Sequence, residues 1–214
     1  MLKKNRWDIC FDGDYMSIII QLKNHKIELD NTIVDALDKL ALILNEWNMT
    51  HNITGAKTIG RIEDNMIDAL LPIDFMTFPQ NILDVGTGAG FPGLVLAIAL
   101  PKSHFTLCEP LQKRTAFLRF AMMEIGLTNV TIVGKKVEEL KDIKYELITS
   151  RAVTNTKLLL DLTCNIRDEN TQYLLYKGSR VFDEIADISS HKPTYDIIEK
   201  DFRNYLHIKS LNVI

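Results

Sequence analysis

The sequence predicts an α/β fold: a mostly parallel, Rossmann-like sheet with helices on both of its faces. Two observations support this prediction. From residue 81 onward, short β-prone runs alternate with apolar helical runs, and alternating β and α segments build parallel sheets. In addition, a glycine-rich stretch at 86–93 joins the strand-like run 81–85 to an apolar helix at 94–100, which is the strand–turn–helix arrangement of this fold class.

Length and composition fit one domain with an N-terminal extension. The chain has 214 residues, of which 46% are hydrophobic and 25% charged, and its formal net charge is −3. The total charge therefore points to no nucleic-acid partner, and any RNA contact would need a local basic patch. Three widely spaced cysteines form neither a disulfide frame nor a zinc motif, and the run Ile18–Ile20 is too short for a signal peptide or membrane span. We therefore expect a cytoplasmic protein with no metal site and no membrane contact.

The first part of the chain, residues 1–78, is expected to be a helical extension packed on a core domain of residues 79–214. A short apolar helix is expected at 15–25. A stronger helix follows, capped by Asn31 or Thr32, and its apolar stripe predicts packing in the core. This stripe comprises Ile33, Val34, Leu37, Leu40, Ala41, Leu44 and Trp47.

A polar loop interrupts the extension at residues 47–55, which are rich in Asn and Thr and end in glycine. The loop has two interpretations, namely turn and capping chemistry or the lining of a substrate entrance. A further helix is expected at 59–71 and stops before Pro72. Residues 72–80 then form the linker into the first strand.

The core domain continues as alternating strands and helices. After 81–85, the expected strands are 104–108, 130–133, 145–149 and 172–176, and the expected helices are 112–125, 155–166 and 180–188. Alternating residues at 205–209, after a polar turn near Arg203 and Asn204, predict a closing antiparallel hairpin. Class I methyltransferases add such a hairpin to their parallel sheet, so a seven-stranded sheet of this class I, Rossmann-like fold is the expected architecture.

Acidic residues around the glycine-rich turn distinguish between cofactors. Asp84 ends the first strand, and Gly86, Gly88 and Gly90 follow it; bare backbone at a helix N-terminus suits a nucleotide-like ligand. A carboxylate at Asp84 suits the ammonium of S-adenosylmethionine better than a pyrophosphate. Glu109, at the end of the second strand, is placed to accept hydrogen bonds from ribose hydroxyls. We therefore predict an S-adenosylmethionine-dependent methyltransferase fold; the alternatives are an NAD-type Rossmann domain and a plain glycine-rich turn.

Basic residues are expected at the same edge of the sheet. Lys113 and Arg114 lie in the first turn of a helix, where exposed positive charge opposes the helix dipole at a cost of about 0.3–1 kcal/mol each. Phosphate contact would explain them, and so would pairing with Glu109. Arg119 lies farther along that helix, Lys135-Lys136 follows the third strand and Lys177 follows the fifth, so together they predict a local basic rim. Solvated surface is the alternative for any one of them.

The loop after the third strand covers the adenine in this fold. Glu138 can accept a hydrogen bond from the exocyclic amine there, and the Val137 backbone can bind the ring edge. An ordinary acidic helix start is the alternative.

The end of the fourth strand faces the transferred methyl group in class I methyltransferases. Residues 149–153 contain no Asn/Asp-Pro-Pro-aromatic tetrad, which would indicate an exocyclic amine, and no Pro-Cys pair for attack on a pyrimidine. Arg151 stands there instead, and arginine is a poor base because it stays protonated. A nucleophile that needs no deprotonation is therefore expected. Guanine N7 fits, since its lone pair is free and arginine reads the N7/O6 edge, so Arg151 is assigned to catalysis.

Taken together, these motifs resemble the RsmG/GidB small-subunit ribosomal RNA guanine-N7 methyltransferases. The matching pieces occur in the family's order over roughly residues 40–180. They are Trp47-Asn48, His51-Asn-Ile-Thr54, Asp84 to Gly93, Lys113-Arg-Thr-Ala-Phe-Leu118, Val137-Glu-Glu139, Ser150-Arg-Ala152 and Lys177-Gly178.

The resemblance implies a cytoplasmic enzyme that methylates N7 of a guanine in the 530 loop of 16S rRNA. It implies that Phe91 and Arg151, together with Gly86, Val137 and Glu138, contact the cofactor. The expected partner is 16S rRNA within the 30S subunit or its precursor, and the expected state is a monomer. The residues assigned to RNA binding are Asn52, Lys113, Arg114, Arg119 and Lys177.

Two departures from the family pattern affect this assignment. Asp64-Asn65 stands where the family usually has Arg-His, so the RNA contacts of that helix are open. Glu109-Pro110 replaces an Asp-Ser pair, which keeps the ribose contact but with a longer side chain. Other functions to be tested are methyl transfer to another RNA or a small molecule, NAD-dependent oxidoreduction, and an RNA-interaction module with a dead site.

Overall fold

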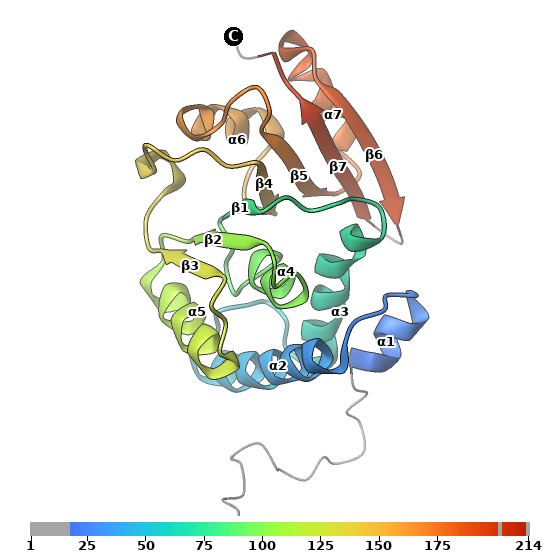
Figure 1. The fold of residues 1–214 in the computed structure, drawn as a ribbon, viewed down its shortest axis with the longest axis vertical. Coiled ribbons are helices and arrows are strands. Elements are labelled where there is room, and N and C mark those ends of the chain that lie inside the picture. The colour runs from blue at the N-terminus through green and yellow to red at the C-terminus, as the bar shows by residue number, and fades with distance from the viewer. Residues whose placement is uncertain (1–17, 201–202, 213–214) are drawn as a thin grey trace, which may run out of the picture.

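A seven-stranded sheet with the order β3-β2-β1-β4-β5-β7-β6 forms the centre of the protein (Figure 1). The structure is a computed structural model that describes residues 18–200 and 203–212. The strands are β1 (Asn81–Val85), β2 (His104–Cys108), β3 (Val130–Val133), β4 (Leu147–Arg151), β5 (Gln172–Lys177), β6 (Thr194–Lys200) and β7 (Arg203–Ser210). The first five are parallel, and β7 is antiparallel to both β5 and β6. The predicted sheet with its closing antiparallel hairpin is therefore confirmed.

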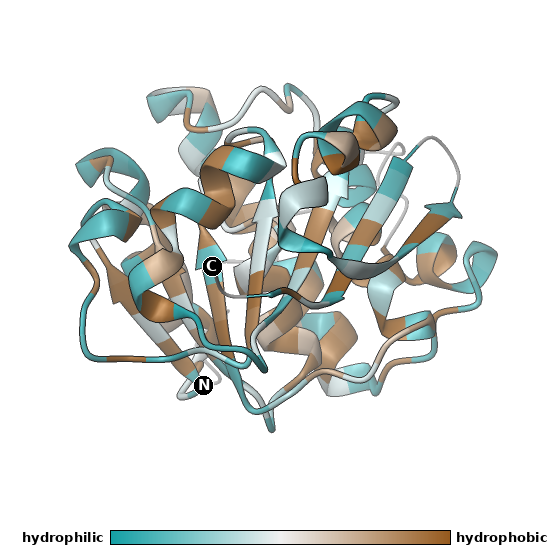
Figure 2. Ribbon diagram, turned by 90° about the horizontal axis from the view of Figure 1, so that it is seen from above, coloured by the Kyte–Doolittle hydropathy of each residue, from teal (hydrophilic) through white to brown (hydrophobic). Residues whose placement is uncertain are grey.

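Helices cover both faces of this sheet (Figure 1). One core contains residues of α1 (Ile18–Asn24), α2 (Asn31–His51), α3 (Ile59–Leu70), α4 (Gly93–Ala99) and α5 (Gln112–Ile125), and the other contains residues of α6 (Thr156–Leu162) and α7 (Val181–Ala186). Short 3₁₀ turns occupy Leu71–Asp74, Val137–Glu139, Cys164–Ile166 and Ser189–His191. The strands carry much of the hydrophobic sequence, whereas many outer turns are hydrophilic (Figure 2). Among the described residues, no helix combines the length and apolarity that crossing a membrane requires.

Successive residues of the strands enter opposite cores, because side chains alternate across a sheet. Ile82 belongs to the core under α4, and Leu83 belongs to the core on the α6 side. Both faces of β1 are thus buried, which explains its continuous apolar sequence.

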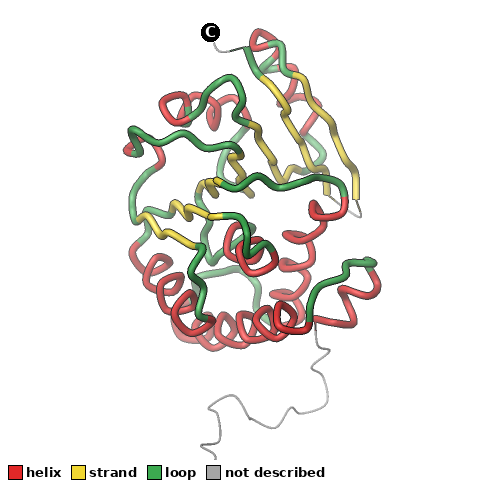
Figure 3. The backbone as a smooth tube through the Cα atoms, viewed as in Figure 1, coloured by secondary structure: helices red, strands yellow, loops and turns green. Residues whose placement is uncertain are grey.

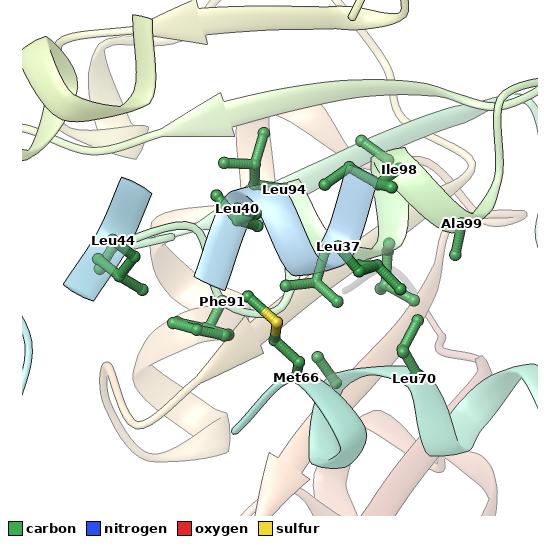
Figure 4. Close-up of a cluster of buried hydrophobic side chains, with 14 of the residues drawn as sticks. Leu37, Leu40, Leu44, Met66, Leu70, Phe91, Leu94, Ile98 and Ala99 are labelled. Carbon is green, nitrogen blue, oxygen red and sulfur yellow. The ribbon is translucent and has the colours of Figure 1, made fainter. Parts of the chain in front are cut away.

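The N-terminal helices share the core of the sheet (Figure 4). The side chains that meet there are Leu37, Leu40 and Leu44 of α2, Met66 and Leu70 of α3, and Leu94 and Ile98 of α4. Burying one such side chain contributes about 1.5–3 kcal/mol, so this contact and not the linker holds the helices in place. The predicted stripe of the second helix is therefore confirmed as core packing. The division at residues 78 and 79 falls between the 3₁₀ turn and β1, and stays a prediction.

Both predicted ends of α2 are wrong. Asp30 is the N-cap residue, because its carbonyl accepts from the N–H groups of Ile33 and Val34. Its side chain makes no capping hydrogen bond. At the other end, the helix continues through the expected loop start to His51. The Trp47 ring packs against two rings of α5, with centroid distances of 5.6 and 5.4 Å, which holds this turn in helical conformation.

Several other boundaries also differ from prediction (Figure 3). β4 is shifted by two residues and ends at Arg151, which pairs with Tyr176 of β5. The helices expected at 155–166 and 180–188 are shorter, and Asn155 caps α6 by accepting from the Leu158 N–H at 2.8 Å. Arg203 and Asn204, expected in the hairpin turn, already belong to β7. Of the helix expected at 15–25, residues 18–24 are helical and residues 15–17 lie outside the described part.

Candidate cofactor and substrate site

The turn after β1 requires glycine for reasons that the structure makes explicit. Gly86 has a φ of +65°, and a Cβ there would lie 2.4 Å from Cγ2 of Val153. At Gly93 the φ is ordinary, but a Cβ would lie 2.5 Å from both Oδ2 of Asp84 and Cδ2 of Leu107. The loop is therefore tight because strand ends and the α4 backbone approach it closely.

A cavity of about 590 Å³ lies over this loop, at the carboxyl edge of the parallel strands. Four segments line it: residues 53–55 of the extension, the glycine-rich loop, residues 109–111 with Arg114, and residues 151–153 after β4. The expected role of the 47–55 loop in lining a substrate entrance is thus supported for its last three residues. The turn chemistry is present as well, since Asn48 Oδ1 accepts from Thr54 N at 3.0 Å and its Nδ2 donates to the Ala56 carbonyl at 2.7 Å.

Glu109 lies at the end of β2 and borders the cavity, as the sequence predicts. Its side chain is buried, and its two carboxylate oxygens accept from the N–H groups of Gly88 and Leu111, each at 3.0 Å. Arg114 approaches the same carboxylate at 3.6 Å, so the predicted pairing of the helix-start cation with Glu109 is confirmed. The ribose contact stays a prediction, and the carboxylate also braces the glycine-rich loop.

Asp84 lies beneath the loop and is completely buried. Its Oδ2 accepts from the Gly93 N–H at 2.8 Å, whereas Oδ1 has no hydrogen-bond partner of ordinary geometry. Burial raises the pKa of this carboxyl to about 7, although the hydroxyl of Thr87, the Gly93 N–H and the Arg151 guanidinium lower it. A buried, unsatisfied carboxylate oxygen is costly, so the site favours either a proton or a cation beside Asp84.

Arg151, the last residue of β4, is held on three sides at the cavity wall. Its Nη1 donates to Asp68 Oδ2 at 2.9 Å and to Asn65 Oδ1 at 3.1 Å, both from α3. Its guanidinium lies over the ring of Phe91, with Cζ 4.8 Å from the ring centroid. Figure 4 shows Phe91 directed toward Met66 of α3, so the stacking ring is itself fixed in the core.

The predicted adenine residues lie in the 3₁₀ turn after β3. Val137 is buried and packs into the core on the α6 side, whereas Glu138 is exposed. Neither lines the cavity as it stands. Their cofactor roles stay predictions.

The predicted RNA-binding residues do not form one continuous free rim. Lys113 Nζ donates to the carbonyl of His51 at 2.8 Å, at the C-terminus of α2, where positive charge is favourable. Asn52 ends that helix at a φ of +49°, and its Oδ1 accepts from Lys57 at 2.7 Å. Arg119 is exposed, while Arg114 is half-buried beside Glu109.

Lys177 is buried, in contrast to the expected surface position. Its Nζ lies 2.7 Å from Glu184 Oε2 and 3.3 Å from the Thr154 carbonyl. The Lys177 hydrogen bond, with two from Thr156, lowers the pKa of Glu184 against the effect of burial, which raises it. An RNA contact by Lys177 would first require this ion pair to open.

The residues around the cavity fit S-adenosylmethionine. The volume is within the range of about 300–1,000 Å³ typical of small-molecule sites. The Thr87 hydroxyl lines the cavity and can donate or accept a hydrogen bond. Asp84 is completely buried and does not line the cavity, so its contact with the cofactor ammonium stays a prediction. Leu111 and Val153 add exposed apolar walls for a planar base.

The strand order, the glycine-rich turn and the cavity at the carboxyl edge define a class I methyltransferase, the class that uses S-adenosylmethionine. Solved structures share this fold. A SAM dependent methyltransferase from Aquifex aeolicus has a TM-score of 0.55 at 13% identity, over 68% of this chain and 90% of that one. Magnesium protoporphyrin IX methyltransferase from Synechocystis, solved with bound SAM, has a TM-score of 0.52 at 12% identity, over 80% and 96%.

The family is more specific than the fold. The GidB family, described as rRNA small subunit methyltransferase G, matches residues 33–213. Ribosomal RNA small subunit methyltransferase G of Wolinella succinogenes is 49% identical over 167 residues, which are 78% of this chain and 86% of that protein. The protein of the same name from Aliarcobacter butzleri is 40% identical over 190 residues, 89% and 97% of the two chains. The chain therefore belongs to the GidB family, and the resemblance seen in its motifs is confirmed.

Two residues of the site were not identified from the sequence alone. Asp68 and Asn65 of α3 both bind Arg151, whereas the only feature predicted for this helix from the sequence was the loss of a basic pair. A signal was present: Asp68 lies in the last turn of a helix, where negative charge opposes the dipole, and so it calls for a cationic partner.

Proposed function

We propose that this protein transfers a methyl group from S-adenosylmethionine to N7 of a guanine in the 530 loop of 16S ribosomal RNA. The observation that carries this proposal is the position of Arg151 at the wall of the cavity beside the glycine-rich loop, in a chain of the GidB family. S-adenosylmethionine supplies an electrophilic methyl group on a sulfonium centre. Guanine N7 carries no proton at neutral pH, so this chain needs no general base and its side chains act by orientation and charge placement.

The residues assigned from the sequence take distinct roles in this proposal. Asp84 meets the ammonium of the cofactor, Glu109 its ribose, and the 3₁₀ turn after β3 its adenine. Arg151 lies between cofactor and base, where its guanidinium is placed to donate to guanine O6 and so present N7. The further cofactor contacts are Gly86, Gly88, Gly90, Phe91, Val137 and Glu138, and the RNA contacts are Asn52, Lys113, Arg114, Arg119 and Lys177.

The proposed setting is the cytoplasm, with a monomer acting on 16S rRNA in the 30S subunit or its precursor. Several of the predicted RNA-binding cations are engaged within the protein, among them Lys113 and Lys177. A small basic surface favours a substrate whose shape is already fixed by assembly, because fewer phosphate contacts are then needed. The same observation supports the alternative, a methyltransferase of another RNA or of a small molecule.

The test is methyl transfer from labelled S-adenosylmethionine to 30S particles taken from cells that lack their own guanine-N7 enzyme, with the product identified by mass spectrometry. We expect label on N7 of one guanine in the 530 loop. Tight cofactor binding without transfer would refute the proposal. Arg151→Ala separates catalysis from a dead-site module: loss of turnover with cofactor binding retained supports catalysis, whereas a dead site shows no turnover in either protein.

A further inference from the structure

The carboxylate of Asp68, in the last turn of α3, opposes the helix dipole. Asp68 lies between Ile67 and Ala69, both buried, and no basic residue occupies the last turn of the helix. A carboxylate at a helix C-terminus is unfavourable by itself, so its partners must lie on other elements.

Those partners come from the end of β4 and from the closing hairpin. Asp68 Oδ2 lies 2.9 Å from Arg151 Nη1, with only 17% and 13% of the two side chains exposed. Asp68 Oδ1 lies 2.5 Å from Arg203 Nε and accepts from the Tyr205 hydroxyl at 2.9 Å. The Tyr205 hydroxyl also lies 2.9 Å from the Asp68 backbone carbonyl, which fixes the orientation of this residue. Both oxygens are thus used, and one carboxylate lies between two guanidinium groups.

Asp68 is linked to the cofactor cavity by its contact with Arg151. Arg151 lines the cavity, whereas Asp68 does not. Three residues restrict the Arg151 guanidinium: Asn65 and Asp68 accept hydrogen bonds from it, and Phe91 lies under it. Of these three, only Asp68 carries a charge.

The charge matters because the proposed reaction is cationic throughout. S-adenosylmethionine carries a sulfonium, and guanine becomes positively charged once N7 is methylated. A guanidinium beside these groups repels them, and the repulsion is strong in a site with little water. Resting on the proposed function, we propose that Asp68 is a positioning residue that both orients Arg151 and neutralises its charge toward the sulfonium.

This role predicts a signature that a purely structural role does not. S-adenosylhomocysteine, the product, has the same shape apart from the methyl group but a neutral thioether. Removing the charge at Asp68 should therefore weaken binding of S-adenosylmethionine more than binding of S-adenosylhomocysteine. A general loss of structure would weaken both equally.

The experiment measures both dissociation constants by calorimetry, in the full-length protein without RNA. For Asp68→Asn we expect the ratio of the S-adenosylmethionine constant to the S-adenosylhomocysteine constant to rise by about threefold or more. Asp64→Asn is the matched control, because it removes the same charge from the same helix at an exposed carboxylate that pairs with Arg61. Its ratio should stay at the wild-type value. An unchanged ratio in folded Asp68→Asn would overturn the proposal.

A second variant covers the case in which Asp68→Asn does not fold. Asn65→Asp places a carboxylate oxygen where the Asn65 amide oxygen now accepts from Arg151. Because Asn65 is only half-buried, we expect this variant to fold. We expect the ratio of the two dissociation constants to fall, because the added negative charge favours S-adenosylmethionine over S-adenosylhomocysteine. An unchanged ratio would contradict the charge argument.

Methyl transfer then separates this inference from the function on which it rests. With active wild-type protein, Asp68→Asn should lower kcat on 30S particles by about tenfold or more, and Asp68→Glu should restore part of it. Wild-type kcat in Asp68→Asn would refute the positioning role while leaving the function intact. An inactive wild type would refute the function, and the ratio of the two dissociation constants would still test Asp68.

Discussion

Asp84→Asn should make the ligand-free protein more stable at alkaline pH while weakening its affinity for S-adenosylmethionine. The carboxyl is completely buried, and burial raises its pKa from 3.8 to about 7. An asparagine at this position can keep the hydrogen bond from the Gly93 N–H through its carbonyl oxygen. It also removes a buried charge whose second oxygen has no hydrogen-bond partner of ordinary geometry.

The sign and size follow from proton linkage. Between pH 3.8 and about pH 7 the unfolded chain has lost this proton while the folded protein holds it, so the stability contributed by protonated Asp84 is lost as pH rises. The shift of roughly three pKa units corresponds to about 4 kcal/mol, which sets the upper limit of the gain for Asp84→Asn above pH 7. About 3 kcal/mol of that gain should disappear between pH 8.5 and pH 5.

Urea unfolding of wild type and variant at pH 5 and pH 8.5 measures this difference, and a cofactor titration at pH 8 measures the affinity. Glu63→Gln is the control, because burial and the nearby Asp38 raise the pKa of Glu63 to about 7 as well. That variant should gain stability with the same sign and keep wild-type cofactor affinity. If Asp84→Asn is no more stable than wild type at pH 8.5, or gains equally at pH 5, the reasoning about Asp84 is wrong.

Three further predictions address the loop, the buried ion pair and the RNA surface. Gly86→Ala should cost about 1–3 kcal/mol of stability and lower cofactor affinity, because the new Cβ would clash with a neighbouring side chain at a left-handed backbone position. The control Gly55→Ala, which has open space around it, should have a melting temperature close to that of wild type in calorimetry. Lys177→Met should cost about 1–3 kcal/mol in urea unfolding, because it leaves the half-buried Glu184 without its cation. Adding Glu184→Gln should recover much of this loss, and a single variant as stable as wild type would contradict the structural role. Arg119→Ala should leave the melting temperature unchanged, because the residue is exposed. It should lower RNA affinity and reduce the slope of log affinity against log salt by about one. An unchanged slope would show that Arg119 does not contact the RNA.

Most of the fold could be predicted because its signals are local. The β-prone runs at β1, β2 and β3, the helical periodicity of α5 and the glycines after β1 each depend on a few neighbouring residues. The boundaries that differ depend on distant contacts. α2 extends to His51 because Trp47 packs on α5, and β4 extends to Arg151 because it pairs with Tyr176 of β5.

The site was predictable in its chemistry but not in its pairing. The acids at the ends of β1 and β2, the glycines and Arg151 all follow from strand ends meeting at one edge of a parallel sheet. Which cations are free does not follow from residue type. Lys113 and Lys177 were both expected at a solvent-facing rim. Lys113 instead donates to the carbonyl of His51 at the end of α2, and Lys177 pairs with Glu184 of α7.

The sequence by itself thus determined the fold class, the family and the residues from which a cofactor cavity is built, since these rest on spacing within strand–turn–helix units. Only the tertiary structure decided how Arg151 is held, because Asp68 and Asn65 reach it from a helix more than eighty residues earlier in the chain. It also decided that Asp84 is buried with one oxygen unsatisfied. The physical reason is common to both: the state of a charged side chain depends on the groups and the solvent around it, and for buried residues these come from elements that only folding brings together.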